Sequence, residues 1–126
     1  MSYREQPTLS EQSAAEDCLY RMLVNLIKVG LVAMDGEVAG GWKSEAMRAH
    51  EELATRFGSL SDDDIKLDQV WNRAREEAQS DRVVQTEESV KPVLQAGCMF
   101  KLRELMAADL NVEAAAARIR VSAATG

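Results

Sequence analysis

The apolar residues between Leu19 and Ala33 recur at helical spacing, and together they form an unusually wide face. They are Leu19, Met22, Leu23, Leu26, Ile27, Val29, Val32 and Ala33. A helix with so wide an apolar face has to be covered on several sides, so this segment predicts a helix in the middle of a bundle. We expect it to run from about Ser10 to Met34, with Gly36 available to take a positive φ at its end.

The same periodicity recurs in the other long segments of the chain. We expect further helices over about Ser44–Phe57, from a Ser61 cap to about Gln79, over Val93–Ala108 with a start or kink at Pro92, and from Val112 through Ile119 behind an Asn111 cap. The stretch "EVAGGWK", residues 37–43, is predicted to be a loop because of its Gly pair. The inward residues of these helices are predicted to include Met47, Leu53, Ala54 and Phe57; Ile65, Leu67, Val70, Trp71, Ala74 and Ala78; Leu94, Cys98, Met99, Leu102, Leu105 and Met106; and Val112, Ala115, Ala116 and Ile119.

The composition agrees with an all-α fold of about five helices. Of the 126 residues, 46% are apolar but only 5% are aromatic, and only two Pro and seven Gly are present, which is too little turn chemistry for an all-β domain. The length suits one domain. We expect a flexible tail over residues 1–9 and a single helical bundle over residues 10–126.

The charge, the cysteines and the histidine limit the possible functions. The net charge is −6, which argues against nucleic acid as the default partner and favours a cation or a basic partner. Cys18 and Cys98 do not form a CxxC pair and both follow apolar helical patterns, so we expect buried free thiols in a reducing compartment, with a disulfide between them as the alternative. The single histidine, His50, is predicted to lie at the surface or boundary of a helix. No signal peptide or membrane span is apparent, and the expected location is the cytoplasm.

Two short stretches share one skeleton. "LVAMDGEV", Leu31 to Val38, and "LMAADLNV", Leu105 to Val112, have Leu, Ala, Asp and Val at the same places. Each follows an apolar helical pattern and precedes another helix. The echo predicts two related helix junctions in one bundle, unless two helices simply happen to end at Asp.

The stretch "LIKVGLVAMDGEV" resembles the first motif of TerB-like domains, the family of the tellurite-resistance protein TerB. "ELMAADLNVEAA" resembles the family's second copy of that motif, with Leu110 in place of Gly, and "FGSLSDDDIKLDQVWNRAREEA" is similar to its middle helix. The resemblance implies an all-helical bundle with pseudo-two-fold symmetry. It also implies a non-enzymatic stress-response or scaffold module, associated with metal-linked or membrane-associated assemblies.

Four acidic residues at the two junctions are the candidate site. Asp35, Glu37, Asp109 and Glu113 offer the hard oxygen ligands that a divalent cation prefers, provided that the two turns meet. A basic partner protein is the other ligand that they could take. Each can instead serve only in a cap or turn. No other cofactor is predicted, and a homodimer stays open.

A DNA-binding regulator is the first alternative. "LNVEAAAARIRVSAAT" resembles the start of a helix-turn-helix, with a turn near Arg120 and a recognition helix beginning at Val121-Ser122. Because the sequence ends at Gly126, that helix would reach base edges only if the natural chain continues.

A small acidic inhibitor or antitoxin is the second alternative. Its acidic runs, Asp62–Asp64, Glu76-Glu77 and Glu87-Glu88, would face a basic partner. An enzyme is not expected, because the sequence contains no acid-base constellation, phosphate loop or metal-hydrolase motif.

Overall fold

The computed structural model is an all-α bundle, as the sequence predicts. It describes residues 9–31, 37–57, 60, 64–80, 98–107 and 110–125, and these ranges contain helices but no strand. The helices are α1 (Leu9–Leu31), α2 (Glu37–Phe57), α3 (Leu67–Ser80), α5 (Leu102–Met106) and α6 (Val112–Thr125). Residues 1–8 of the expected tail, the Asp35-Gly36 stop, the Ser61 cap and Pro92 lie outside the described residues, whereas Leu9 is the first residue of α1. The side chains of Val32, Ala33 and Leu94 also lie outside the described residues.

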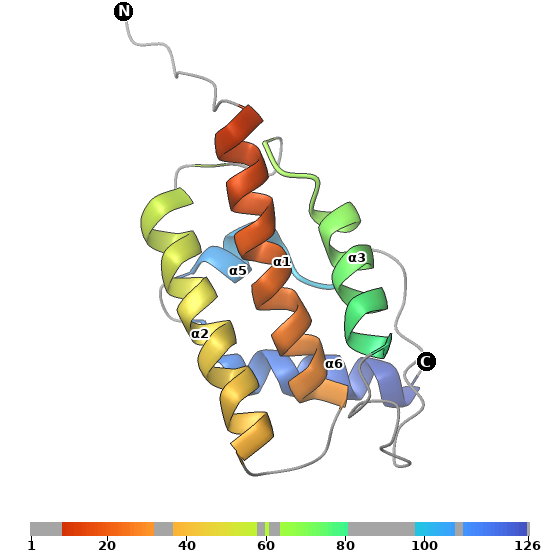
Figure 1. Ribbon diagram of the computed structural model, residues 1–126. Coiled ribbons are helices and arrows are strands. Elements are labelled where there is room, and N and C mark those ends of the chain that lie inside the picture. Colours follow the sequence, from red (N-terminus) through yellow and green to blue (C-terminus); the bar gives the residue numbers. More distant parts are fainter. Residues whose placement is uncertain are drawn as a thin grey trace, which may run out of the picture.

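Helix α1 is the centre of the bundle. It packs against α2, α3 and α6, and Figure 1 shows α2 and α3 on its two sides with α5 and α6 behind. Its predicted apolar face is confirmed at five positions, which are at most 1% exposed: Leu19, Met22, Leu23, Leu26 and Ile27. Burial of such side chains is the main stabilising contribution in a helical bundle. The wide apolar stripe therefore did identify the innermost helix.

Helix α6 crosses close to the end of α1 at Gly30. A Cβ atom built on Gly30 would lie 2.8 Å from the carbonyl oxygen of Ala116 and 2.8 Å from Cβ of Ile119. Only a residue without a side chain allows the two backbones to approach this closely. The sequence prediction did not single out Gly30.

Helix α2 begins at Glu37, so the predicted loop over residues 37–43 is wrong. Gly40 and Gly41 are both helical. Each costs about 1 kcal/mol relative to Ala in a helix, but burial of Ala46, Ala49 and Leu53 against the core offsets that cost.

The predicted inward face of α2 is confirmed at Leu53 and Phe57, whereas Ala54 is only half-buried. Met47 is 59% exposed, so its predicted inward position is wrong. Ala46 and Ala49 are buried on this stretch of α2 instead, so the buried face passes through Ala46 and not through its neighbour Met47.

Helix α3 begins at Leu67, six residues later than the predicted cap. Glu16 on α1 accepts a hydrogen bond from the backbone N–H of Lys66 at 3.1 Å, and the Lys66 carbonyl accepts from Gln69 and Val70. This contact from α1 fixes the start of the helix. The predicted inward residues are confirmed in that Ile65, Val70, Trp71, Ala74 and Ala78 are buried, although Ile65 precedes the helix and Leu67 is only half-buried.

The predicted helix over Val93–Ala108 is wrong between Cys98 and Lys101, where the backbone is not helical, and α5 has only five residues. The Cys98 N–H donates to the Asp68 carboxylate at 2.9 Å, and the Phe100 ring packs edge-on against Trp71. Both contacts come from α3. They hold this segment in a non-helical bend against α3, while Leu102 and Leu105 are buried as predicted.

Helix α6 begins as predicted. The Asn111 side chain accepts a hydrogen bond from the Ala114 N–H at 3.1 Å, which is an N-cap contact, and Val112, Ala115, Ala116 and Ile119 are buried. The helix continues without interruption to Thr125. The backbone near Arg120 is therefore helical and does not form the turn that a helix-turn-helix requires.

None of the helices in the described ranges is both long enough and apolar enough to cross a membrane.

Candidate functional site

Only one of the four candidate carboxylates lies on a described side chain. Asp35 and Asp109 fall outside the described residues, and Glu37 is described only as the first residue of α2. Glu113 lies in the first turn of α6 with 77% of its side chain exposed, and its Oε1 is 3.5 Å from Nζ of Lys43 on α2. Glu113 is therefore the candidate residue from which the surroundings of the site can be described.

Two contacts bring α2 against the second junction. The Lys43–Glu113 ion pair joins the helices that follow the two junctions. Further along α2, Nε2 of His50 lies 2.7 Å from the carbonyl oxygen of Ala107, so Nε2 has to carry the hydrogen. Glu37 precedes Lys43 by about 9 Å along the helix axis, at 1.5 Å per residue. The start of α2 and the start of α6 thus belong to one side of the bundle.

No metal cluster is present among the side chains that the structure describes. There, no three His, Cys, Asp or Glu residues gather closely enough to hold an ion. Glu113 forms an ion pair with the ammonium group of Lys43.

Arg118 organises a groove between α6 and the segment before α5. Its guanidinium lies 3.0 Å from Glu104 Oε2, donates to the Met99 carbonyl at 3.3 Å and lies 4.6 Å from the centroid of the Phe100 ring. A cavity of about 280 Å³ lies beside it, reaching Leu110 and Ala114. A backbone hydrogen bond from Lys101 and then the Arg118 guanidinium lower the pKa of Glu104. Arg118 is thus held in place by contacts within the chain.

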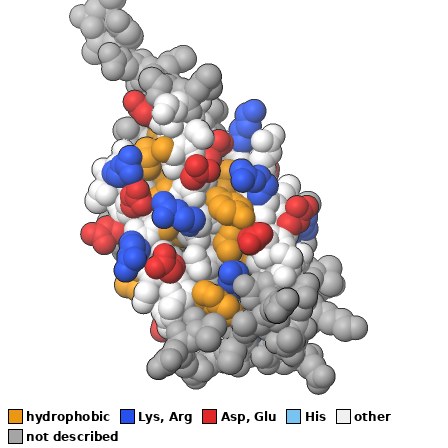
Figure 2. Space-filling view, in the orientation of Figure 1, with side chains coloured by type: hydrophobic (Ala, Val, Ile, Leu, Met, Phe, Trp, Pro, Cys, Tyr) orange, Lys and Arg blue, Asp and Glu red, His pale blue; other side chains and the backbone are white. Residues whose placement is uncertain are grey.

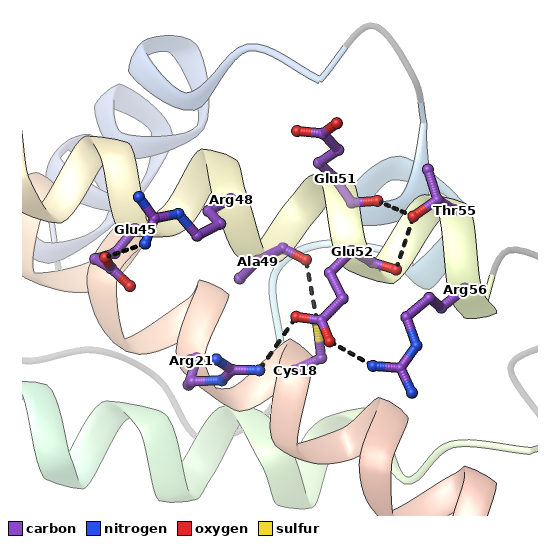
Figure 3. Close-up of polar contacts among 9 residues, drawn as sticks. All are labelled: Cys18, Arg21, Glu45, Arg48, Ala49, Glu51, Glu52, Thr55 and Arg56. Atoms are coloured by element: carbon purple, nitrogen blue, oxygen red, sulfur yellow. Dashed lines mark hydrogen bonds and ion pairs between the residues drawn. The ribbon is translucent and has the colours of Figure 1, made fainter.

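A second polar cluster closes the seam between α1 and α2 (Figure 3). Glu52 lies between two guanidiniums, 3.3 Å from Arg21 and 2.6 Å from Arg56. Beneath it, the Cys18 thiol donates to the Ala49 carbonyl at 3.0 Å. The three charged side chains are partly or largely exposed, so they contribute little stability and mainly cover the apolar seam.

The two thiols are free, as predicted. Cys18 is buried, and burial raises its pKa. Cys98 is only half-buried, which departs from the expected full burial, and desolvation raises its pKa to about 11. Since the thiolate is the reactive form, both sulfurs are poor nucleophiles near neutral pH.

The acid excess is not on the described helices. Figure 2 shows Lys and Arg side chains interleaved with Asp and Glu over one face of the bundle. Eight of the 21 acidic residues but only three of the 15 basic residues lie outside the described ranges, so five of the six net negative charges belong there. Asp35 and Asp109 are two of those acids. The helical body itself is nearly neutral.

Comparison of the chain with known protein families, with curated proteins and with solved structures finds no match. The resemblance to TerB-like domains therefore depends on the quoted motifs alone.

Sequence reasoning missed the Lys43–Glu113 and Glu104–Arg118 pairs. Their partners lie 70 and 14 residues apart. Neither separation matches the spacing of three or four residues that marks a pair on one helix, so no local signal could have found them.

Proposed function

We propose that this protein is a non-enzymatic binding module whose two helix junctions bind a basic segment of a partner protein. The residues that would make the contact are Asp35, Glu37, Asp109 and Glu113. The observation that carries the proposal is the Lys43–Glu113 ion pair, because it joins the helices that follow the two related junctions. It also demonstrates that Glu113 accepts an ammonium group at the surface.

The excess of acidic over basic residues outside the described ranges, with Asp35 and Asp109 among the acids, supports a basic ligand. Carboxylates that lie close together repel one another until a cation neutralises them. Lys43 supplies one positive charge to Glu113. Lys or Arg residues of a partner can supply the positive charges that neutralise the remaining junction carboxylates, or can displace Lys43 from Glu113. A surface ion pair at 3.5 Å is weak, so this displacement costs little.

Several observations favour binding over catalysis. Both thiols have raised pKa values, and His50 is engaged with a backbone carbonyl. The scaffold and stress-response part of the proposal comes from the TerB-like resemblance of the two junction motifs. The DNA-binding alternative loses its support because α6 is uninterrupted. An inhibitor or antitoxin would bind its basic partner through the acidic runs Asp62–Asp64, Glu76-Glu77 and Glu87-Glu88 instead of the junctions, so it differs in the surface as well as in the partner.

A fluorescent lysine-rich peptide tests the proposal directly. We expect Asp35→Asn and Glu37→Gln each to weaken its binding about two- to fivefold, as for other exposed ion pairs. Asp17→Asn and Glu51→Gln are matched controls on exposed positions of α1 and α2 and should leave binding unchanged. Equal binding by all four variants would refute the junction site.

Thermal melts with calcium, magnesium or zinc distinguish a metal ion from a basic protein. The proposal expects the peptide, and not these ions, to raise the melting temperature through Asp35 and Glu37. A calcium shift that Asp35→Asn and Glu37→Gln abolish, without peptide binding, would replace the basic partner by a divalent cation. Identification of the natural partner needs affinity purification from the host with the same variants as controls.

A further inference from the structure

The outer side of α6 carries an apolar stripe at coiled-coil spacing. Ala114, Ala117 and Val121 lie on α6, and Leu110 precedes the helix by two residues; the four follow one another at intervals of four, three and four residues. Ala114 and Ala117 are exposed and Leu110 is half-buried. Val121 is 62% exposed and is one of two large hydrophobic residues that the described part of the chain exposes. The opposite side of α6 packs on α1, so the helix is apolar on two sides.

The stripe borders an apolar groove. The cavity of about 280 Å³ lies beside Leu110 and Ala114 and is walled by Phe100. A second cavity of about 410 Å³ lies beside Ala117 and Val121 and is walled by Met99. Arg118 lines both. Phe100 borders the first half of the stripe and Met99 the second half, and a helix laid on the stripe would cover both cavities.

We propose that this groove binds α6 of a second copy of the chain, in the antiparallel direction. With the two-fold axis between Ala115 and Ala116, Ala114 faces Ala117 of the second copy and Leu110 faces Val121 of the second copy. The central alanines allow close approach of the helices, and the larger residues fill the ends. The two-fold repeats each contact, as an isologous dimer requires.

Charge complementarity favours this register. The residues flanking the stripe on one side are Glu113 and Arg120, and in the antiparallel pair Glu113 lies next to Arg120 of the second copy. The two-fold generates two such pairs. A parallel pair would instead place Glu113 next to Arg118 of the second copy, but Arg118 is already held by Glu104, the Met99 carbonyl and Phe100. Glu113 is held less firmly, because its exposed ion pair with Lys43 at 3.5 Å is weak and can be shared with Arg120 of the second copy. Antiparallel helix dipoles are also favourable.

The inference is independent of the proposed function, although Glu113 takes part in both. The peptide site depends on Asp35 and Glu37, whereas the dimer depends on Arg120 and Val121. Loss of peptide binding in Asp35→Asn with an unchanged dimer, or the reverse in Arg120→Glu, distinguishes failure of one from failure of the other.

Charge exchange tests the dimer by sedimentation equilibrium. The wild type should dimerise reversibly, and Glu113→Arg or Arg120→Glu should each weaken dimerisation at least about tenfold by placing like charges together. The double variant Glu113→Arg/Arg120→Glu should restore it. Circular dichroism checks that each variant is folded.

Val121→Asp tests the apolar layer and should also yield monomer, while Met47→Asp, at the other exposed hydrophobic residue, should not. A wild type that remains monomeric at every concentration overturns the proposal. So does a dimer that Val121→Asp, Arg120→Glu and Glu113→Arg leave unchanged.

Discussion

Gly30 is the residue at which the packing of the bundle has the least tolerance. A Cβ there would approach the Ala116 carbonyl oxygen and Ile119 Cβ to 2.8 Å, whereas a Cβ at Gly40 on α2 meets nothing within 4 Å. We expect Gly30→Ala to lower the free energy of unfolding by about 1–3 kcal/mol through overpacking. Gly40→Ala should raise it by about 0.5–1 kcal/mol through helix propensity. Urea unfolding of both variants measures this, and equal effects would contradict the close crossing.

Glu104 links stability to pH at the same scale. Its pKa is below the ordinary 4.5 because Lys101 N–H and Arg118 stabilise the carboxylate. A lowered pKa in the folded state means that the contribution is present above about 4.5 and is lost as the pH falls through the folded-state pKa. We expect Glu104→Gln to reduce the loss of stability between neutral pH and pH about 3. Identical acid titrations of urea midpoints for variant and wild type would contradict this.

Helix α6 depends on its N-cap at the scale of the element. The Asn111 side chain accepts the Ala114 N–H at 3.1 Å, and its carbonyl accepts the Ala115 N–H. We expect Asn111→Ala to cost about 1 kcal/mol and Asn111→Asp to cost much less, because Asp keeps the acceptor. Chemical denaturation monitored by circular dichroism measures both. Similar losses in the two variants would show that the cap contact contributes nothing.

At the scale of the whole molecule, contact with α1 couples α2, α3 and α6 to one core. Helix α1 packs on each of them, and Trp71 on α3 is fully buried. We therefore expect the described helices to unfold together. In a Trp42→Phe variant, fluorescence of Trp71 and helical circular dichroism should have coincident midpoints in urea. Separate midpoints would show that α3 or another helix unfolds independently.

Local sequence patterns were enough to predict the helical class and most of the core. Apolar periodicity and capping chemistry are local properties, so the first identified the buried faces of α1, α3 and α6 and the second identified the Asn111 cap, without knowledge of the partners. The acidic junction motif could be located in the same way. Of its four residues, however, only Glu113 has a described side chain, and the sequence held no sign that Lys43 would be its partner.

Packing between distant segments sets where several helices begin and what lies between them. Helix α2 extends through Gly40 because core burial outweighs the low helix propensity of glycine. Helix α3 starts at Leu67 because Glu16 holds Lys66, and Cys98 is not helical because Asp68 binds its N–H. The contacts at Lys66 and Cys98 join residues 50 and 30 positions apart in the chain. The free energy of such contacts depends on how the helices pack, which no local pattern encodes.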